Sequence, residues 1–128
     1  MTREEQMLEA RKLGDARRKP FLKDPSDFED LCSIPGACYV SDRIVIDGVR
    51  VGYMYREDPD NRLDSGWRFL SGDESEEYMD DSWNLGLYEL NTICNYDRDV
   101  IPFLGSEWPS EFARNSTSGI LEPIARHP

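Results

Sequence analysis

The sequence predicts a single α+β domain in which short helices pack on one side of an antiparallel sheet. Its 128 residues suit one domain. Asp47-Gly48 stands between two β-branched runs, Arg43–Ile46 and Val49–Val51. This pattern is typical of a tight hairpin, because glycine readily adopts the positive φ that such turns need. The links between the early strands are too short for crossover helices, which argues against a parallel sheet.

The N-terminal part of the chain differs in charge from the rest. Residues 1–23 hold seven Lys/Arg and four acids, net +3, whereas the remaining 105 residues carry eight arginines and 22 acids, net −14. Good helix formers over Glu4–Lys19, with a thin apolar stripe broken at Gly14, predict a marginal helix there. We therefore expect an N-terminal basic helical segment (1–23), an α+β domain (24–112) and a C-terminal tail (113–128).

Four segments inside the domain are expected to be helical, one of them, Asp73–Asp81, as a short acidic helix or an ordered loop whose early acids suit a helix N-terminus. Ser26–Leu31 resembles a short helix capped by its own serine. Apolar residues recur at helical spacing around Leu87–Cys94, which favours a helix there, although a strand remains an alternative. Asp97 or Asp99 is suited to cap one helical turn over Val100–Leu104.

Strands are expected where β-branched and aromatic residues gather or alternate with polar ones. These strands are Ala37–Ser41, the two arms of the hairpin ending at Arg56, and Gly66–Gly72. After Gly105 the chain is polar and rich in Ser, Asn and Gly, so we expect it to wrap the surface.

Acidic residues dominate the composition and concentrate in one segment. The 26 acids exceed the 15 basic residues by 11, and residues 57–81 alone hold ten acids and two arginines. Such a charge repels nucleic acids and anionic membranes and favours a cationic protein partner. We expect the acids to act together by raising the rate of association with the partner, and no single acid to contribute much. The candidate partner-binding residues are Asp73, Glu74, Glu76, Glu77, Asp80 and Asp81.

The residues that commonly carry cofactor or nucleophile chemistry are sparse. Three cysteines without a CxxC spacing predict reduced thiols, at least two of them buried, in a cytosolic protein. The sole histidine, His127, is next to the last residue, which argues against a Cys-His or Ser-His site and against zinc. The glycines form no phosphate-binding motif. We expect no metal, no cofactor and no membrane-spanning segment.

Clustered carboxylates could bind calcium or catalyse hydrolysis, or they could simply be acids exposed to solvent. Asp58, Asp60 and Asp64 alternate like a calcium loop, but Arg62 stands at a ligand position and the required glycine is missing, so a solvated turn is favoured. A pair of close carboxylates in a cleft is the minimum for a small hydrolase. Because the chain has so many acids, two carboxylates often lie close together by chance. The hydrolase is therefore the least favoured of the functions considered.

Several motifs, agreeing in order and spacing over about residues 37–104, resemble one bacterial family. They are Cys38-Tyr-Val-Ser-Asp-Arg, Gly52-Tyr-Met-Tyr-Arg-Glu, Asp64-Ser-Gly-Trp-Arg-Phe-Leu-Ser-Gly-Asp-Glu-Ser and Leu90-Asn-Thr-Ile-Cys-Asn-Tyr-Asp. The family is the thirty-third of the predicted immunity-protein families of polymorphic toxin systems, formerly a domain of unknown function. The resemblance implies a non-catalytic α+β domain that binds and neutralises a toxin.

The most distinctive motif contains Gly66, Trp67, Phe69 and Gly72, for which we expect a structural role. No catalytic residue is carried over from the family. Two other functions remain alternatives to immunity: a regulatory or adaptor domain that binds a protein unrelated to toxins, and the small carboxylate hydrolase. A toxin gene beside this one would favour immunity, whereas a cleft with two close carboxylates of shifted pKa would favour the enzyme.

Overall fold

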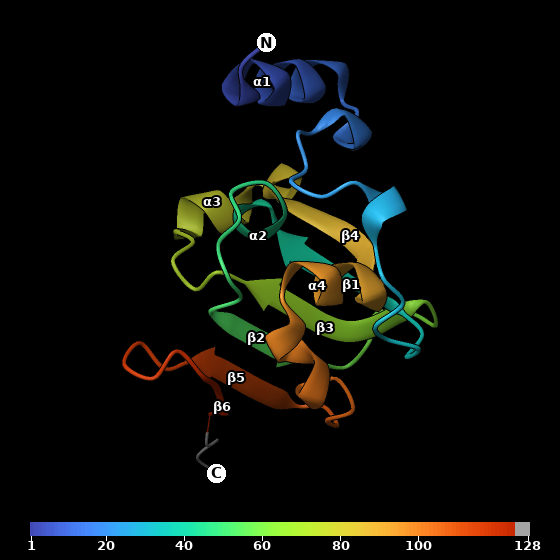
Figure 1. Cartoon of the computed structure of the whole chain (residues 1–128), viewed down its shortest axis with the longest axis vertical. Coiled ribbons are helices and arrows are strands. Elements are labelled where there is room, and N and C mark those ends of the chain that lie inside the picture. Colours follow the sequence, from blue (N-terminus) through green and yellow to red (C-terminus); the bar gives the residue numbers. More distant parts are fainter. Residues whose placement is uncertain (125–128) are drawn as a thin grey trace.

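A computed structural model describes residues 1–124 as one six-stranded mixed sheet with short helices around it (Figure 1). The strand order is β4-β1-β3-β2-β5-β6. The strands are β1 (Ala37–Ser41), β2 (Tyr53–Arg56), β3 (Asp64–Leu70), β4 (Leu85–Glu89), β5 (Ser110–Arg114) and β6 (Leu121–Pro123). The α-helices are α1 (Arg3–Leu13), α2 (Asp42–Val45), α3 (Glu76–Asp80) and α4 (Leu90–Tyr96). The 3-10 segments are η1 (Ala16–Arg18), η2 (Pro25–Asp27), η3 (Ser82–Asn84) and η4 (Arg98–Phe103).

The α+β class and the single domain are confirmed, but the sheet is not purely antiparallel. Strand β1 pairs parallel with β3, with Tyr39 opposite Arg68, whereas the other four pairings are antiparallel. The argument against parallel pairing applies only to strands that follow each other directly in the chain. Here α2 and β2 both lie between β1 and β3 in the chain, and this connection is long enough to return to the same end of the sheet.

The predicted hairpin at Asp47-Gly48 is wrong. Residues Asp42–Val45 form α2, which Ser41 caps by accepting a hydrogen bond from the Arg43 amide. Gly48 has φ 79° and donates its N–H to the Ile44 carbonyl, so it ends the helix instead of turning a hairpin. Both structures need a residue of positive φ at that point, and the local pattern does not separate them.

The predicted Ser26–Leu31 helix is reduced to the single turn η2, capped by Asp24 rather than by a serine. The residues that follow are extended and lie along α4. The Asn91 side chain accepts hydrogen bonds from the Leu31 and Cys32 amides at 2.7 and 3.0 Å. Because α4 supplies these acceptors, this backbone is satisfied without forming a helix of its own.

The segment predicted as a helix over Leu87–Cys94 is split by the structure. Its first part completes the edge strand β4, which was the alternative, and its second part is α4, with Leu90, Ile93 and Cys94 buried. The polar segment after Gly105 contains β5 and β6, which the sequence did not reveal. Strand β5 buries only Phe112 of its five residues, which is too little for a strand pattern to stand out.

The helix expected over Glu4–Lys19 is shorter than predicted: α1 ends at Leu13, where Gly14 adopts φ 64°, and only the single turn η1 follows. The expected cap at Asp97 is confirmed, because its side chain accepts from the Asp99 amide at 3.0 Å and caps η4. Strand β3 lies where the third strand was expected. Cys38 and Cys94 are buried, as predicted for at least two of the three thiols. Among the described residues, no helix is long and apolar enough to cross a membrane.

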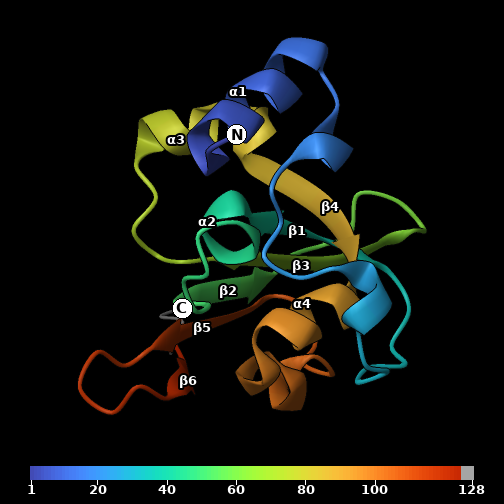
Figure 2. The same cartoon turned by 45° about the horizontal axis from the view of Figure 1, so that its top comes forward.

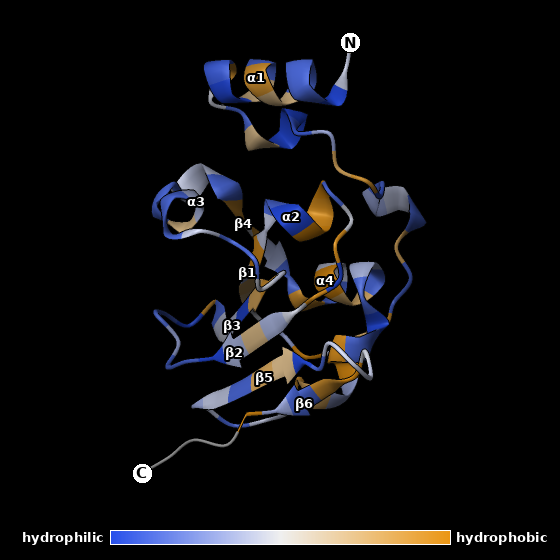
Figure 3. Ribbon diagram, turned by 90° about the vertical axis from the view of Figure 1, so that its left-hand side faces the viewer, coloured by the Kyte–Doolittle hydropathy of each residue, from blue (hydrophilic) through white to orange (hydrophobic). Residues whose placement is uncertain are grey.

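The hydrophobic core lies between one face of the sheet and the helices α2, α4 and η4. Trp67 and Phe69 of β3 are fully buried there, stacked with 5.9 Å between ring centroids. Helix α1 lies beyond the β4 edge, and Figure 2 shows it beside α3, where Arg11 pairs with Asp81 at 2.6 Å. The other face of the sheet carries neither α2 nor α4 (Figure 3). It is the surface on which the candidate site is built.

Candidate functional site

Alternation along the strands sends one set of side chains into the core and the other to the opposite face, here called the open face. The strand register places Leu87, Tyr39, Arg68 and Tyr55 side by side across β4, β1, β3 and β2. The apolar, aromatic and basic side chains at the centre of the open face are Tyr39, Tyr53, Tyr55, Arg68, Leu70, Leu85 and Leu87, and the register adds Glu89 and Glu111 toward its margins. Leu87 is 60% exposed and Tyr39 is 37% exposed, so the face is apolar and reaches solvent.

Helix α3 covers one end of the open face and closes a small pocket against it. This pocket, called the Met79 pocket, has a volume of about 180 Å³. It is lined by Tyr39, Tyr55, Arg68, Leu70, Met79 and Leu85. Five of the six residues are aromatic or apolar, and Met79 comes from α3. No local sequence pattern predicts this pocket, because none shows that α3 returns to the sheet.

Arg68 lies in the middle of the open face, yet it is only 5% exposed. It donates to both carboxylate oxygens of Asp64 at 2.8 Å and to Glu57 Oε2 at 2.8 Å. Its guanidinium also stacks 4.8 Å from the centre of the Tyr39 ring, and Asp60 approaches it to 3.6 Å. A buried cation surrounded by three carboxylates leaves the exposed part of this region negative.

The bidentate hydrogen bonds from Arg68 hold the pKa of Asp64 well below its usual range. Because the unfolded chain binds a proton at Asp64 more readily than the folded one, stability should fall as the pH drops below about 4. An Asp64→Asn variant should therefore be less stable at pH 6, and its stability should depend less on pH between 5 and 2.5. Urea unfolding at a series of pH values measures this slope; equal slopes in both proteins would contradict it.

The alternation of Asp58, Asp60 and Asp64 is not a calcium loop in this structure. Both oxygens of Asp64 face Arg68, and Asp64 Oδ2 also accepts from the Asp60 amide at 2.9 Å. The carboxylate that would anchor a cation is thus already paired with one. Within residues 1–124 no group of three or more His, Cys, Asp or Glu is arranged to hold a metal ion.

The six predicted partner-binding acids fall into two groups. Asp73 pairs with Arg43 at 2.9 Å, and hydrogen bonds from Arg43 and Ser71 lower the pKa of Asp73 to about 2. Glu74 accepts from the amides of Ser71 and Gly72 at 2.8 and 2.9 Å. Asp81 caps η3 and pairs with Arg11. These three acids hold the loop before α3 and the N-terminal helix, so they form part of the scaffold.

The other three acids, Glu76, Glu77 and Asp80, are exposed on α3. None of them forms an ion pair with a residue of the described chain. Ser75 caps this helix by accepting from the Tyr78 amide at 3.0 Å, and Met79 lies among the three acids in sequence. These three acids of the predicted acidic segment therefore flank Met79, which lines the Met79 pocket.

Three residues of the distinctive motif, Gly66, Trp67 and Phe69, are buried, whereas Gly72 is exposed in the loop before α3. Gly66 has φ 87°, and a Cβ there would stand 2.2 Å from the Glu57 carbonyl oxygen, so no other residue fits. Trp67 donates from Nε1 to the Leu104 carbonyl at 3.2 Å. Phe69 is fully buried, and Gly72 has φ 95° and donates its N–H to Glu74.

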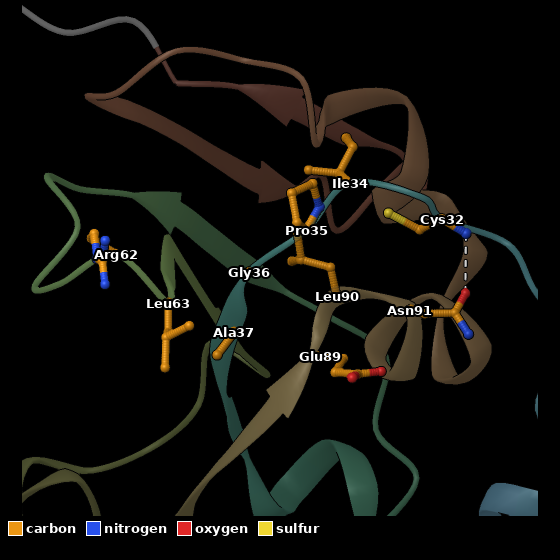
Figure 4. Close-up of a pocket in the computed structure, with 10 residues that line it drawn as sticks. All are labelled: Cys32, Ile34, Pro35, Gly36, Ala37, Arg62, Leu63, Glu89, Leu90 and Asn91. Atoms are coloured by element: carbon orange, nitrogen blue, oxygen red, sulfur yellow. Dashed lines mark hydrogen bonds between the residues drawn. The ribbon is translucent and has the colours of Figure 1, made fainter.

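Larger pockets than the Met79 pocket lie elsewhere on the molecule, and the two largest of them contain carboxylates. One, of about 490 Å³, lies at the ends of β1 and β4 and has a single carboxylate, Glu89, in its lining (Figure 4). The other, of about 510 Å³, lies between α1 and α2 and is lined by Glu4, Asp42 and Asp47 among others. Burial raises the pKa of Asp42, but its side chain is 6% exposed and bonded to Lys19. Asp47 pairs with Arg43, so these acids serve the scaffold.

The fold and the site define a small acidic α+β domain without an evident catalytic constellation among its described residues. The chain belongs to an immunity-protein family: residues 38–124 match the model described as the Immunity protein Imm33 domain. This confirms the resemblance drawn from the motifs and extends it through β5 and β6. No curated protein and no solved structure matches the chain.

Proposed function

We propose that this protein is a non-catalytic bacterial immunity protein that binds and neutralises a cognate toxin of a polymorphic toxin system in the cytoplasm. The observation that carries the proposal is the match to the immunity-protein family over most of the chain. The site supports it, because the open face offers aromatic and apolar side chains of the kinds enriched in protein interfaces. No part of the proposal requires a cofactor.

The charge of the surface supports a cationic toxin. Glu76, Glu77 and Asp80 are exposed and form no ion pair with any other residue of 1–124, while Arg68 on the open face is buried among carboxylates. A surface of this kind speeds association with basic proteins by long-range attraction, even where each exposed pair contributes only about 0 to 1 kcal/mol. A toxin that acts on nucleic acid is a natural cationic partner.

Co-expression with a candidate toxin domain, chosen from the genes that neighbour this one, tests the proposal. The toxin domain alone should stop growth, and adding this protein should restore growth while the two proteins purify together as a complex. Growth that stays arrested, with no complex formed at micromolar concentrations, would exclude immunity toward that toxin. A stable complex with a non-toxic protein from the same operon would favour the regulatory or adaptor function instead.

Neutralising the three free acids should slow association without unfolding the protein. The variant Glu76→Gln/Glu77→Gln/Asp80→Asn should lose about tenfold in association rate with its toxin at low salt and show a weaker salt dependence. Its unfolding free energy should stay within about 1 kcal/mol of the wild type, since surface charges contribute little. Stopped-flow kinetics at several ionic strengths and urea unfolding of the same variant measure both quantities.

The matched control removes the same charge elsewhere. Glu9→Gln/Asp30→Asn/Glu107→Gln changes three exposed acids outside α3 and should slow association much less. Equal slowing by both triple variants would show that only net charge matters, and the site on α3 would be wrong. By contrast, Asp73→Asn/Glu74→Gln should destabilise the loop before α3, since it replaces one of the two Glu74 oxygens that accept from the Ser71 and Gly72 amides and removes the ion pair of Asp73 with Arg43.

A further inference from the structure

We infer that the Met79 pocket is an anchor site that takes one apolar side chain from a basic segment of the partner. The inference deepens the proposed function and rests on it for naming the partner as a toxin. Recognition through an anchor site requires more of the partner than recognition through acidic charge alone. A basic surface would not be enough; the partner must also present a leucine, methionine or aromatic side chain at its centre.

The first argument is the size and lining of the pocket. Its volume of about 180 Å³ is close to that of a cavity of about 150 Å³ that holds a benzene molecule, so it has room for one such side chain. Leu70, Met79 and Leu85 provide apolar walls, and Met79 is flexible enough to adjust to the side chain that enters. Buried side chains inserted into such pockets provide most of the binding energy in protein interfaces.

The second argument is the distribution of charge around the pocket. Arg68 contributes to the lining, but it is 5% exposed and Asp64 and Glu57 already neutralise it. Glu57 and Asp60, whose side chains are 51% and 68% exposed, pair with this lining residue. The three acids of α3 that form no ion pair within residues 1–124 flank Met79, another lining residue, in the sequence. An apolar centre with an acidic rim complements a basic segment that carries an apolar side chain.

The same charges argue against a second copy of this chain as the occupant. Two open faces brought together would place the α3 acids of one copy against the acidic rim of the other. With a net charge of −11 on each copy, this contact is repulsive. A basic partner therefore remains as the occupant that the surface favours.

Panning a phage-displayed library of random twelve-residue peptides against the full chain tests the inference without a known toxin. Enriched peptides should combine Lys or Arg with at least one Leu, Met, Phe or Ile. A chemically synthesised representative should bind the wild type and lose at least tenfold in affinity to a Met79→Lys variant. Binding is measured by fluorescence anisotropy and folding by thermal unfolding of each variant.

Two further variants keep the test decisive. Leu8→Lys makes the same kind of change at an α1 residue that is 69% exposed, and it should bind within about twofold of the wild type. Leu87→Lys changes the 60% exposed position next to Tyr39 and should weaken binding severalfold. Because Leu87 is exposed, this variant should stay folded, so the test remains valid even if Met79→Lys unfolds.

Four results would overturn the inference: no enrichment above that for an unrelated acidic domain, enrichment of peptides lacking basic or apolar residues, equal binding to all three lysine variants, or a dimer in sedimentation that Leu87→Lys dissociates. The last result would assign the face to a second copy. Failure here with toxin protection intact would remove only the anchor site. Success here without toxin protection would leave the anchor site and remove immunity.

Discussion

Replacing Trp67 with alanine should lower the free energy of unfolding by about 4 kcal/mol, the largest effect expected of any single core substitution here. Trp67 is fully buried at the centre of β3, between Phe69 and Phe112. Alanine would leave a cavity that these rings cannot fill, and it would strip the Leu104 carbonyl of its Nε1 donor. Since domains of this size are stable by only about 5 to 15 kcal/mol, a large part of the stability would be lost.

Urea unfolding followed by circular dichroism measures the effect, and Trp108 provides the matched control. Trp108 is 47% exposed and stacks against Arg56, with 5.0 Å between the guanidinium and the ring centre. Trp108→Ala should cost about 1 kcal/mol or less. If the two substitutions cost the same, Trp67 is not the centre of the core that the structure describes.

Replacing Lys19 with methionine should cost about 3 to 5 kcal/mol at neutral pH. The Lys19 ammonium donates to Asp42 Oδ2 at 2.9 Å and to the Trp83 carbonyl at 2.6 Å, and its side chain is 1% exposed. Without it, the buried Asp42 carboxylate has no cation. Asp42 Oδ1 already lacks a hydrogen-bond partner among the described residues, so the remaining charge would be poorly compensated.

The cost should shrink as the pH falls, and this separates charge from packing. Burial raises the pKa of Asp42, so the folded state binds a proton there more readily than the unfolded state. In Lys19→Met, protonation removes the uncompensated charge, and the variant should regain stability relative to the wild type at acidic pH. The double variant Lys19→Met/Asp42→Asn should regain stability already at pH 7. If it is no more stable than Lys19→Met, the cost lies in packing and the pair is not the cause.

The elements that sequence reasoning predicted correctly are those whose signals are local. Gly14 ends α1 and Asp97 caps η4 through contacts within a few residues, and β3 is recognisable from its own aromatic residues. The segment Arg43–Ile46 was wrongly predicted as a strand because its apolar residues are all buried. A fully buried helical turn shows neither the period of a strand nor that of an amphipathic helix.

The candidate site was predictable only in part. The acidic segment was found from charge alone, but which acids are free depends on partners far away in sequence, such as Arg11 for Asp81 and Arg43 for Asp73. One signal was present and not used: Asp64 and Arg68 are four residues apart on a strand, and therefore on the same face. The Met79 pocket forms from four strands and a helix, and no single segment encodes it.

The position of the basic N-terminal segment gives the molecule a permanent electric dipole. Residues 1–19, with six Lys/Arg and four acids, net +2, lie at one end of the structure, beyond β4, whereas the rest of the chain carries a net charge of −13 (Figure 1). In the field of a cationic partner such a dipole experiences a torque that turns the basic end away and the acidic body forward. Approaching molecules would thus be partly oriented before contact, which narrows the rotational search that ordinarily slows protein association.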